Sequence, residues 1–521
     1  MQGLKLRIRL FIFLLLGTSS SAYAIADRFR CTWRDDPATS MVIGWDQLSG
    51  NDPVLYYSEK NHGQKVSFYE RSTRPGYRIK AKGMFNHFVR LTGLKPNTVY
   101  HFIVKDSEGM SMPLSFKTAP DTPERLAIIA GGDSRNHRDA RRKANRLVAK
   151  LRPHFVMFAG DMTNNDTAPE WRNWFDDWQL TIGQDGRITP IVVARGNHEA
   201  SNKSVSTIFD VKNPGIFYGF NFAGDLLRIY TLNSLIPPGG KQRSWLEADL
   251  AAHEQVQWKM AQYHHSIRPH TAKKPERNEL MVNWAPLFYK HQVNLVVESD
   301  AHVVKSTHPI RPSREAGSEE GFIRDDERGT VYIGEGCWGA PLRTNNDDKS
   351  WTRASGSFNQ FKWIFVDEYG IEVRTVKVDS EERVQDAATT NLFSVPAGLE
   401  LWQPESGEVI YIRNDKTAPP PAVTAATPPK KTNARDWSQF PLLRPDAATG
   451  KVRLEYALAE ACDLTILLID SNWKEITRAK LPNQAKGPYA KKMDTSKIPA
   501  GKYLLVIKSG KNILKRYRID K

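Results

Sequence analysis

Four apolar runs of strand length, each ending in polar residues, constrain the fold of this 521-residue chain more than any other feature. They read RLAIIAGGD, HFVMFAGD, TPIVVARGNHE and VNLVVESDAH, and helical patterns such as RDARRKANRLVAKL lie between them. Continuous apolar runs are typical of strands buried on both faces, and their alternation with helices favours a layered α/β domain. We therefore predict such a domain over residues 121–380, with polar side chains at the carboxyl ends of its strands.

The polar residues that follow these strands have oxygen and imidazole side chains, which suit Fe, Mn or Zn ions. Any one of them alone is a common loop residue, but several in series, each after an apolar strand, indicate a shared site. They are Asp133, Asp161, Asn197 with His198, Asp300 with His302, and His264 with His265 in the motif QYHHS.

Residues 25–120 have a different pattern, with short alternating strands separated by turn residues, as in SMVIGWDQ and MPLSFKT. The run LKPNTVY, from Leu94 to Tyr100, resembles the tyrosine corner of fibronectin-type sandwiches, in which a Tyr hydroxyl bonds back to the preceding corner. This segment is predicted to form an N-terminal β-sandwich of the fibronectin III type.

Together these motifs resemble the calcineurin-like metallophosphoesterases, and within them the purple acid phosphatase branch. That branch carries GDxG, GDxxY, GNH[DE], VxxH and GHxH in this order, after a fibronectin-like domain, and the resemblance covers roughly residues 28–378. It implies a central α/β metallophosphoesterase sandwich that binds two divalent or trivalent metal ions. A hydroxide bridging the two metals would attack a phosphate ester in line.

Site residues follow from this resemblance, position by position. The implied metal ligands are Asp133 and His302 for the first metal, Asn197, His264 and Asp300 for the second, and Asp161 as the bridge between them. His198 would contact the phosphate and assist the leaving group. His265 is an alternative to His264, although the family spacing favours the first histidine.

The sequence departs from the family pattern at three positions. In SDAH, Asp300 stands where GHxH has its first histidine; as a carboxylate ligand it would favour harder ions such as Mn or Mg, and the alternative is a loop cap. Asn164 replaces the tyrosine of GDxxY, so Asn164 or water would complete the first metal's ligands and the protein is expected to be colourless. Arg135 stands where simpler relatives have the histidine of D-x-H.

Two further residues are candidates for binding substrate. Arg135 could grip a phosphate through two guanidinium N–H groups, or pair with a structural carboxylate such as Glu199. His270, in HHSIRPH, is a candidate for the rim of the substrate entrance, and the alternative is an ordinary solvent-exposed histidine.

The first 24 residues have a basic start, an apolar run from Leu10 to Leu16 and small residues up to Ala24. This is the pattern of a cleaved secretory signal, with cleavage near Ala24, so we expect an exported protein. The chain has three cysteines, Cys31, Cys337 and Cys462, whose odd number excludes a complete disulfide framework; buried, unreactive thiols are the expectation.

Most of the formal charge of +16 lies near the C-terminus, since residues 430–521 hold 20 Lys and Arg against 9 Asp and Glu, a net +11. Apart from three basic residues in the predicted signal, the rest of the chain is nearly balanced, at +2, so specific nucleic-acid recognition is not expected. Residues 381–433 are predicted to be an extended region and Pro-rich linker. Residues 434–521 are predicted to form a small basic β-sandwich, which could sort the protein, bind an anionic cell surface, or serve only as an accessory domain.

The leading hypothesis is an exported binuclear metal-dependent phosphomonoesterase, acting on a phosphorylated small molecule or polymer. A phosphodiesterase with the same site is the alternative within the enzyme class. A non-catalytic surface-binding protein with a degenerate metal site is the alternative outside it. The substrate, the metals and the oligomeric state are not determined by the sequence.

Overall fold

The computed structural model describes residues 26–387 and 392–413, and then strands and short segments at 442–446, 451–458, 462–470, 475–484, 487–494, 498–499, 502–509 and 512–520. The predicted signal segment and the Pro-rich part of the predicted linker lie outside these residues. The chain divides into two compact units, Met1–Pro420 and Pro421–Lys521. Within the described part of the chain, no helix combines the length and the apolar character needed to cross a membrane.

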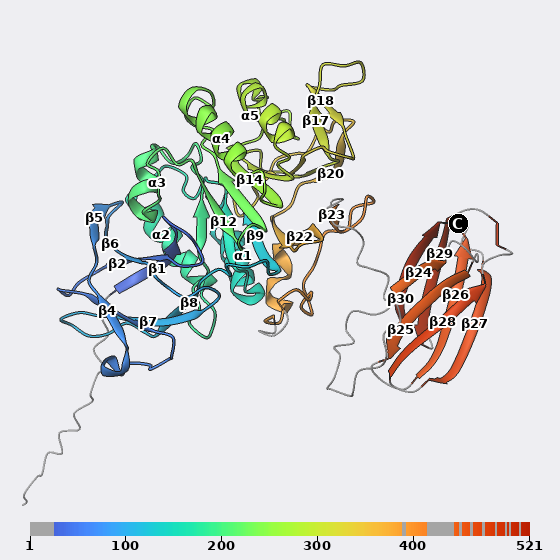
Figure 1. The fold of residues 1–521 in the computed structure, drawn as a ribbon, viewed down its shortest axis with the longest axis horizontal. Helices are drawn as coiled ribbons and strands as arrows, with labels where there is room; N and C mark the ends of the chain where they lie inside the picture. The colour runs from blue at the N-terminus through green and yellow to red at the C-terminus, as the bar shows by residue number, and fades with distance from the viewer. Residues whose placement is uncertain are drawn as a thin grey trace, which may run out of the picture. The chain divides into compact units, whose positions relative to one another are not determined.

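The N-terminal part of the first unit consists of two four-stranded antiparallel sheets, as predicted for a fibronectin-like sandwich (Figure 1). In spatial order the strands are β1 (Ala26–Thr32), β2 (Met41–Gln47), β6 (Met84–Leu91) and β5 (Tyr77–Ala81), and then β4 (Arg71–Thr73), β3 (Val54–Ser58), β7 (Val99–Lys105) and β8 (Leu114–Lys117). The tyrosine corner is present, because the Lys95 backbone N–H donates to the Tyr100 hydroxyl at 2.9 Å.

The central part is built on two larger mixed sheets. The first has six strands, in the order β11 (Ile191–Val193), β10 (Phe155–Phe158), β9 (Leu126–Gly131), β21 (Gln360–Val366), β22 (Gly370–Lys377) and β23 (Ile410–Arg413). The second has seven, in the order β12 (Tyr218–Phe222), β13 (Leu227–Thr231), β14 (Trp258–His265), β15 (Leu295–Ser299), β19 (Val331–Gly334), β16 (Val304–Thr307) and β20 (Thr352–Gly356). The four apolar runs of the sequence form β9, β10, β11 and β15, which confirms their prediction as strands.

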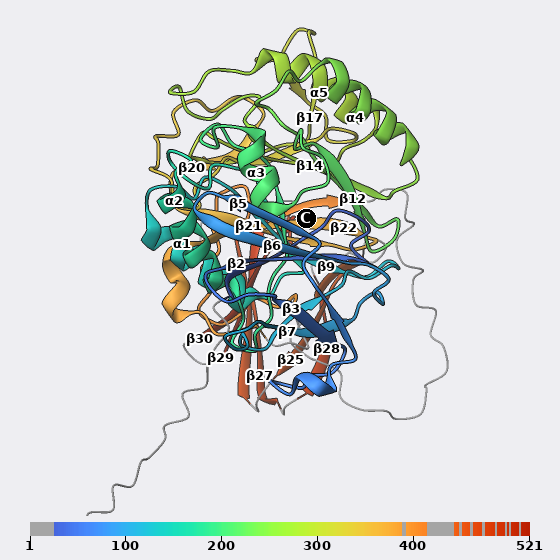
Figure 2. The ribbon, with the colours of Figure 1, turned by 90° about the vertical axis from the view of Figure 1, so that its left-hand side faces the viewer.

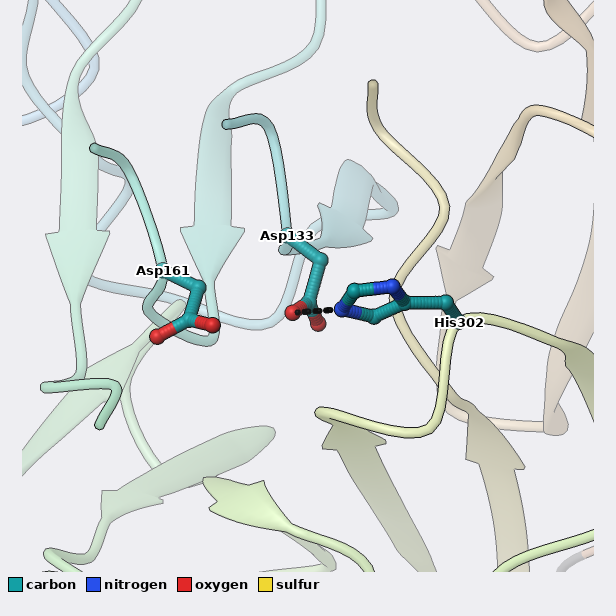
Figure 3. A group of neighbouring side chains, drawn as sticks. All are labelled: Asp133, Asp161 and His302. Carbon is teal, nitrogen blue, oxygen red and sulfur yellow. Dashed lines mark ion pairs between the residues drawn. The ribbon is translucent and has the colours of Figure 1, made fainter. Parts of the chain in front are cut away.

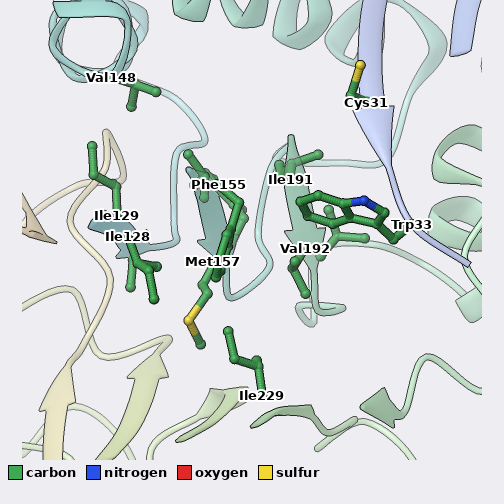
Figure 4. Close-up of a cluster of buried hydrophobic side chains, with 14 of the residues drawn as sticks. Cys31, Trp33, Ile128, Ile129, Val148, Phe155, Met157, Ile191, Val192 and Ile229 are labelled. Atoms are coloured by element: carbon green, nitrogen blue, oxygen red, sulfur yellow. The ribbon is translucent and has the colours of Figure 1, made fainter. Parts of the chain in front are cut away.

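The two central sheets share one core. Successive residues of a strand face opposite sides, and in β13 the side chain of Ile229 joins the core that contains β9 and β10, whereas Tyr230 joins a second core. Figure 4 shows Ile229 beneath Met157 of β10, with Ile128 and other branched side chains around them. Part of the first core therefore lies between the two central sheets, and the same core continues under α1 and α2 and into the N-terminal sandwich.

Helices cover the outer faces of this sandwich. The second core joins the outer face of the seven-stranded sheet to α4 (Gly240–Ala252) and α5 (Asn278–Lys290), which lie over that sheet in both ribbon views (Figures 1 and 2). On the other side, α1 (Arg138–Leu151) and α2 (Ala168–Trp178) bury apolar side chains in the first core, including Leu147, Trp174 and Trp178. A further helix, α3 (Asn202–Phe209), follows β11.

The short elements of the first unit are η1 (Val66–Phe68), η2 (Gln179–Thr181), η3 (Val378–Arg383) and a two-stranded sheet of β17 (Ile310–Pro312) and β18 (Phe322–Arg324). One boundary differs from the prediction, which ended the α/β domain at residue 380. Strand β23 pairs antiparallel with β22 and extends the six-stranded sheet, so part of the predicted extended region belongs to this domain. The segment was misassigned because a single four-residue strand gives little periodic signal.

The second unit contains a three-stranded and a four-stranded antiparallel sheet, in line with the predicted C-terminal β-domain. Their strands are β24 (Leu442–Asp446), β25 (Lys451–Leu458) and β28 (Gly487–Asp494), and β27 (Glu475–Gln484), β26 (Cys462–Asp470), β29 (Lys502–Ser509) and β30 (Asn512–Asp520). Alternate residues of β26 and β29, such as Leu464, Ile466 and Leu505, form its apolar core.

Cys31 and Cys337 are free and buried, as expected, and burial raises the pKa of both thiols. The side chain of Cys462 lies outside the described residues.

Candidate metal centre

The strand order brings the polar ends of strands from both central sheets together. Strands β9, β10 and β11 are parallel neighbours, and β14 and β15 are parallel neighbours in the other sheet. Parallel strands present their carboxyl ends at one edge, so the residues just after them meet there. The six-stranded sheet supplies Asp133, Asp161 and Asn197, and the seven-stranded sheet supplies His264, Asp300 and His302.

A first group consists of Asp133, Asp161 and His302, whose ligand atoms all lie within 4.8 Å of one another. Figure 3 shows the two carboxylates and the imidazole turned toward a common point, with His302 Nε2 3.0 Å from Asp133 Oδ1. All three residues are buried, with at most 1% of their surface exposed. Their geometry fits one metal ion with three protein ligands.

A second group surrounds His264. Its Nε2 lies 2.9 Å from Asn197 Oδ1, 3.3 Å from Asp161 Oδ1 and 3.6 Å from Asp300 Oδ1. Asp161 belongs to both groups, through Oδ1 here and through its other oxygen beside Arg135. The six ligands implied by the family resemblance therefore converge in two sets that share Asp161.

The two histidines are held in the tautomer that a metal ligand needs. His264 Nδ1 lies 2.8 Å from the Ala159 carbonyl, and His302 Nδ1 lies 2.7 Å from the Pro341 carbonyl. A carbonyl oxygen only accepts, so each Nδ1 carries a proton, and Nε2 is the ring atom that faces the carboxylates and can bind a metal. His302 Nε2 lies 3.0 Å from Asp133 Oδ1, so a metal ion could take the place of a proton between these two ligand atoms.

Glu199 fixes the loops that carry Asp161 and Asn197. Its carboxylate accepts backbone N–H groups of Asp161 at 3.0 Å, Met162 at 2.8 Å and Gly196 at 2.7 Å, and the residue is fully buried. The sequence did not reveal this role, although a glutamate directly after the site residues of GNHE is the available signal. The suggested pairing of Glu199 with Arg135 is wrong, since the carboxylate is engaged by these backbone groups.

The same two loops approach each other so closely that only glycine fits. Gly160 has a φ of +89°, and a Cβ there would stand 2.3 Å from the Gly196 nitrogen. Asp133, Asp161, Asp300 and His302 also have positive φ values, between 55° and 68°. Non-glycine residues adopt this region at a cost, and such residues gather at functional sites.

Arg135 lies between the first group and Asn164. Its Nε is 3.4 Å from Asp161 Oδ2, its Nη2 is 3.4 Å from His302 Nε2, and its Nη1 donates to Asn164 Oδ1 at 2.9 Å. Asn164 Oδ1 also accepts from Asn136 Nδ2 at 3.1 Å, so the predicted ligand atom of Asn164 is engaged in hydrogen bonds. Arg135 thus stands as a fixed positive charge beside the first group.

Asp300 has a partner that the sequence did not suggest. Lys274 Nζ forms an ion pair with Asp300 Oδ1, and Arg343 donates to the Asp300 carbonyl at 2.7 Å. Burial opposes ionisation of Asp300, but His264 and Lys274 hold its pKa below the ordinary value. The loop-cap alternative gives no account of this side chain, which faces His264 and Lys274. Lys274 lies on a loop without a recognisable motif, so no sequence signal marked it.

The pKa values of Asp161 and Asp133 show how far nearby positive charge compensates the two buried carboxylates. Burial raises the pKa of Asp161 to about 8, and Asp133 and Glu199 add to this rise, while His264 opposes it. For Asp133, burial again opposes ionisation, but His302 and His264 hold its pKa well below the ordinary range. Bound cations would remove the repulsion between the two aspartates.

Three other predicted site residues are placed as follows. His198 donates its backbone N–H to Asp161 Oδ1 at 2.9 Å, and its ring Nε2 is 3.8 Å from Asp161 Oδ2 with 27% of the side chain exposed. His265 lies against Ser234, which leaves His264 as the histidine directed at the ligands. His270 was expected at an entrance or in solvent, and both expectations are wrong: it is fully buried, with Nε2 2.7 Å from the Thr352 hydroxyl.

Comparison with known proteins agrees with the metal-binding site described above. Residues 26–118 match the family model described as the purple acid phosphatase N-terminal domain, and residues 128–304 match the calcineurin-like phosphoesterase model. An uncharacterized protein of Mycobacterium tuberculosis is 25% identical over 370 residues, which is 59% of this chain and 68% of that protein. Purple acid phosphatase 15 of Arabidopsis thaliana is 23% identical over 268 residues, or 43% of this chain and 50% of that one.

Solved structures share the fold. Purple acid phosphatase PPD1 from yellow lupin superimposes with a TM-score of 0.57 at 14% identity, covering 71% of this chain and 76% of that one. PhoD superimposes with a TM-score of 0.54 at 12% identity, covering 76% of this chain and 92% of that one. The chain therefore belongs to the calcineurin-like metallophosphoesterases, with the N-terminal domain of the purple acid phosphatases.

Proposed function

We propose that this metallophosphoesterase is an exported phosphomonoesterase with two metal ions. The observation that carries the proposal is the pair of ligand groups that share Asp161, built from both sheets at the strand ends. This arrangement is that of a hydrolase which uses two adjacent metal ions on one phosphate.

Asp133, Asp161 and His302 would hold one ion, and Asn197, His264 and Asp300 would hold a second one together with Asp161. Asp133 Oδ1 and Asp161 Oδ2 are buried and, among the described residues, accept no hydrogen bond. Carboxylate, amide and imidazole ligands of this kind suit Mn, Fe or Zn, and the carboxylate of Asp300 in place of an imidazole favours the harder ions. When bound, the ions would neutralise the phosphoryl oxygens and activate a water molecule.

His198 is positioned to handle the proton of the leaving group. Its Nδ1 lies 2.5 Å from the Asn164 carbonyl, so Nδ1 carries a proton, and its Nε2 lies 3.8 Å from Asp161 Oδ2 on a side chain that is 27% exposed. A second proton at Nε2 can pass to the oxygen of the departing alcohol. The hydrogen bond to Asn164 fixes the ring, which acts as a general acid only when it is oriented toward that oxygen.

Arg135 is positioned to hold the phosphoryl group. Its guanidinium is fixed by Asn164 and Asn136, both at 2.9 Å from Nη1, which leaves Nη2 beside His302. A planar guanidinium held in this way donates to phosphate oxygens with little loss of side-chain freedom. We expect Arg135→Ala to raise the KM for a monoester at least tenfold.

The test is phosphate release by the protein loaded in turn with Mn, Fe, Zn or Mg, acting on an aryl phosphate monoester and the matching diester. Asp161→Asn is the control, since it removes the shared ligand charge. Monoester turnover that disappears in the control supports the proposal. A preference for the diester would replace it with a phosphodiesterase, and no turnover with any metal would indicate a metal site used only for binding.

Export and surface binding complete the proposal. The support for export is the N-terminal pattern up to Ala24, and the test is the N-terminal sequence of protein recovered outside the cytoplasm. The net charge of +11 in residues 430–521 supports binding to an anionic surface. Such binding should weaken steeply between low and physiological salt, and salt-insensitive retention would refute an electrostatic role.

A further inference from the structure

A polar cleft of about 170 Å³ lies beside the metal centre. Its lining includes three arginines and three asparagines, Arg135, Arg138, Arg141, Asn136, Asn164 and Asn173. None of the roles assigned so far requires this cavity. Its lining is rich in hydrogen-bond donors, which favours a polar ligand.

Arg135 connects the cleft to the metal ligands. Through Nε it faces Asp161 Oδ2 at 3.4 Å, and through Nη1 it reaches Asn164 and Asn136 in the cleft lining. The residue is only 9% exposed, so one rigid guanidinium forms the partition between the two spaces. A substrate whose phosphoryl group lies at the metal ligands therefore has a neighbouring space within reach of a short substituent.

The cleft carries an excess of positive charge. Arg138 and Arg141 both bind the single carboxylate of Asp177, which they share with Arg142. Asp177 is buried and is not part of the lining. The carboxylate that does line the cleft, Glu170, accepts backbone N–H groups of Asn165 and Thr167 at 2.8 and 3.3 Å. The lining itself thus presents three guanidinium groups and one engaged carboxylate, and the nearest carboxylate behind it, Asp177, is shared by three arginines, which favours an anionic ligand.

We propose that this cleft binds a second anionic group of the substrate. The inference rests on the proposed phosphoesterase function and names its substrate class: phosphate esters of short alcohols that carry a carboxylate or a further phosphate. The phosphoryl group lies at the metal ligands, the bridging alcohol passes Arg135, and the second anion meets Arg138. Arg138 reaches that anion because 37% of its side chain is exposed, whereas Arg141 is buried behind it.

The experiment compares two esters of equal length, 3-phosphooxypropanoate, which carries a carboxylate, and 3-hydroxypropyl phosphate, which carries a hydroxyl. We expect the metal-loaded enzyme to favour the carboxylate ester at least tenfold in kcat/KM. Arg138→Gln should reduce this preference to less than threefold. The matched control is Arg142→Gln, which loses the same partner, Asp177, from a similarly exposed side chain that is not part of the lining, and it should keep the preference.

Each outcome separates this inference from the function on which it rests. Hydrolysis of both esters at equal rates would overturn the anion site and leave the phosphoesterase in place. An equal loss of preference in both arginine variants would overturn it too, because general charge would explain the effect. If neither ester is hydrolysed, the proposed function fails, and the anion site is then tested by the dissociation constants of the two esters, measured by calorimetry. A tenfold lower dissociation constant for the carboxylate ester supports the anion site, and equal constants overturn it.

Discussion

Glu199 supports the metal centre without being a ligand, so its replacement isolates the contribution of the surrounding scaffold. In Glu199→Gln the side chain keeps its shape and loses its charge. Oε2 accepts hydrogen bonds from the backbone N–H groups of Asp161 and Gly196, and Oε1 accepts one from that of Met162. The amide will therefore keep its oxygen at the Oε2 position and turn its NH2 toward the N–H of Met162.

The cost follows from these three bonds. A hydrogen bond to a charged partner contributes about 1.5–3 kcal/mol and a neutral one about 1 kcal/mol, so the two retained bonds weaken by about 1 kcal/mol each. The buried donor of Met162 loses its acceptor, which costs a further 1–3 kcal/mol or so. The sum is about 4 kcal/mol in the free energy of unfolding. With a urea m-value of about 3 kcal/mol/M, the unfolding midpoint should fall by about 1.3 M.

The assay is urea unfolding of the metal-free protein, followed by the tryptophan fluorescence of the first unit. The control is Glu381→Gln, because Glu381 is also buried but pairs with the partly exposed side chains of Arg146 and Lys150. Those partners can turn to water, so the control should lose no more than about 1 kcal/mol. A loss below about 1 kcal/mol in Glu199→Gln, or one equal to the control's, would refute the assignment of Glu199 as the tie between the two loops.

Three further predictions concern the same framework. Gly160→Ala places a Cβ 2.3 Å from the backbone nitrogen of Gly196, so it should lower metal affinity at least tenfold in a calorimetric titration; unchanged affinity would show that the loops separate freely. Lys305→Met leaves the buried carboxylates of Glu298 and Glu335 without their cation and should cost about 3–5 kcal/mol in urea unfolding, whereas a loss under about 1 kcal/mol would mean that the carboxylates are already protonated. Burial lowers the pKa of His270 to about 2, so the folded state loses about 1.4 kcal/mol of stability per pH unit as the pH falls below about 6.5, until the folded pKa is reached. In His270→Gln the urea midpoint should therefore fall less steeply between about pH 6 and pH 4 than in the unmodified protein. Parallel curves for the two proteins would contradict this.

The sequence predicted the central fold because its apolar runs are continuous and end in polar residues. A run such as that preceding Asp161 is buried on both faces, so strand propensity, burial and position in the sheet agree. The tyrosine corner at Tyr100 was predictable for a similar reason, since its turn residues and hydroxyl form one local unit. Strand β23 was missed, because its four residues belong to the sheet only through pairing with β22, far from any motif.

The limits on predicting the site were different. The six ligands were implied by the family resemblance of the motifs at the strand ends, and the structure brings them together in two groups that share Asp161. Lys274 and Glu199 were not assigned, because their roles come from contacts with Asp300 and with backbone N–H groups that no spacing encodes. His270 was expected at the rim of the substrate entrance or in solvent, whereas it is buried and its backbone N–H donates to the buried carboxylate of Glu335 at 3.0 Å, a contact that no sequence motif encodes.

The origin of the ligands in two different sheets gives the metals a mechanical role. Without ions, the polar contacts between the two edges include the hydrogen bond from the Asp300 N–H to Asp133 Oδ2, at 2.7 Å, and that from His264 Nδ1 to the Ala159 carbonyl, at 2.8 Å. Ions at a thousand times their dissociation constant would stabilise the folded state by about 4 kcal/mol per site, and each site takes ligands from both sheets. Metal loss and opening of the sandwich thus become one event, so the enzyme should lose activity and resistance to proteases together when it is starved of metal.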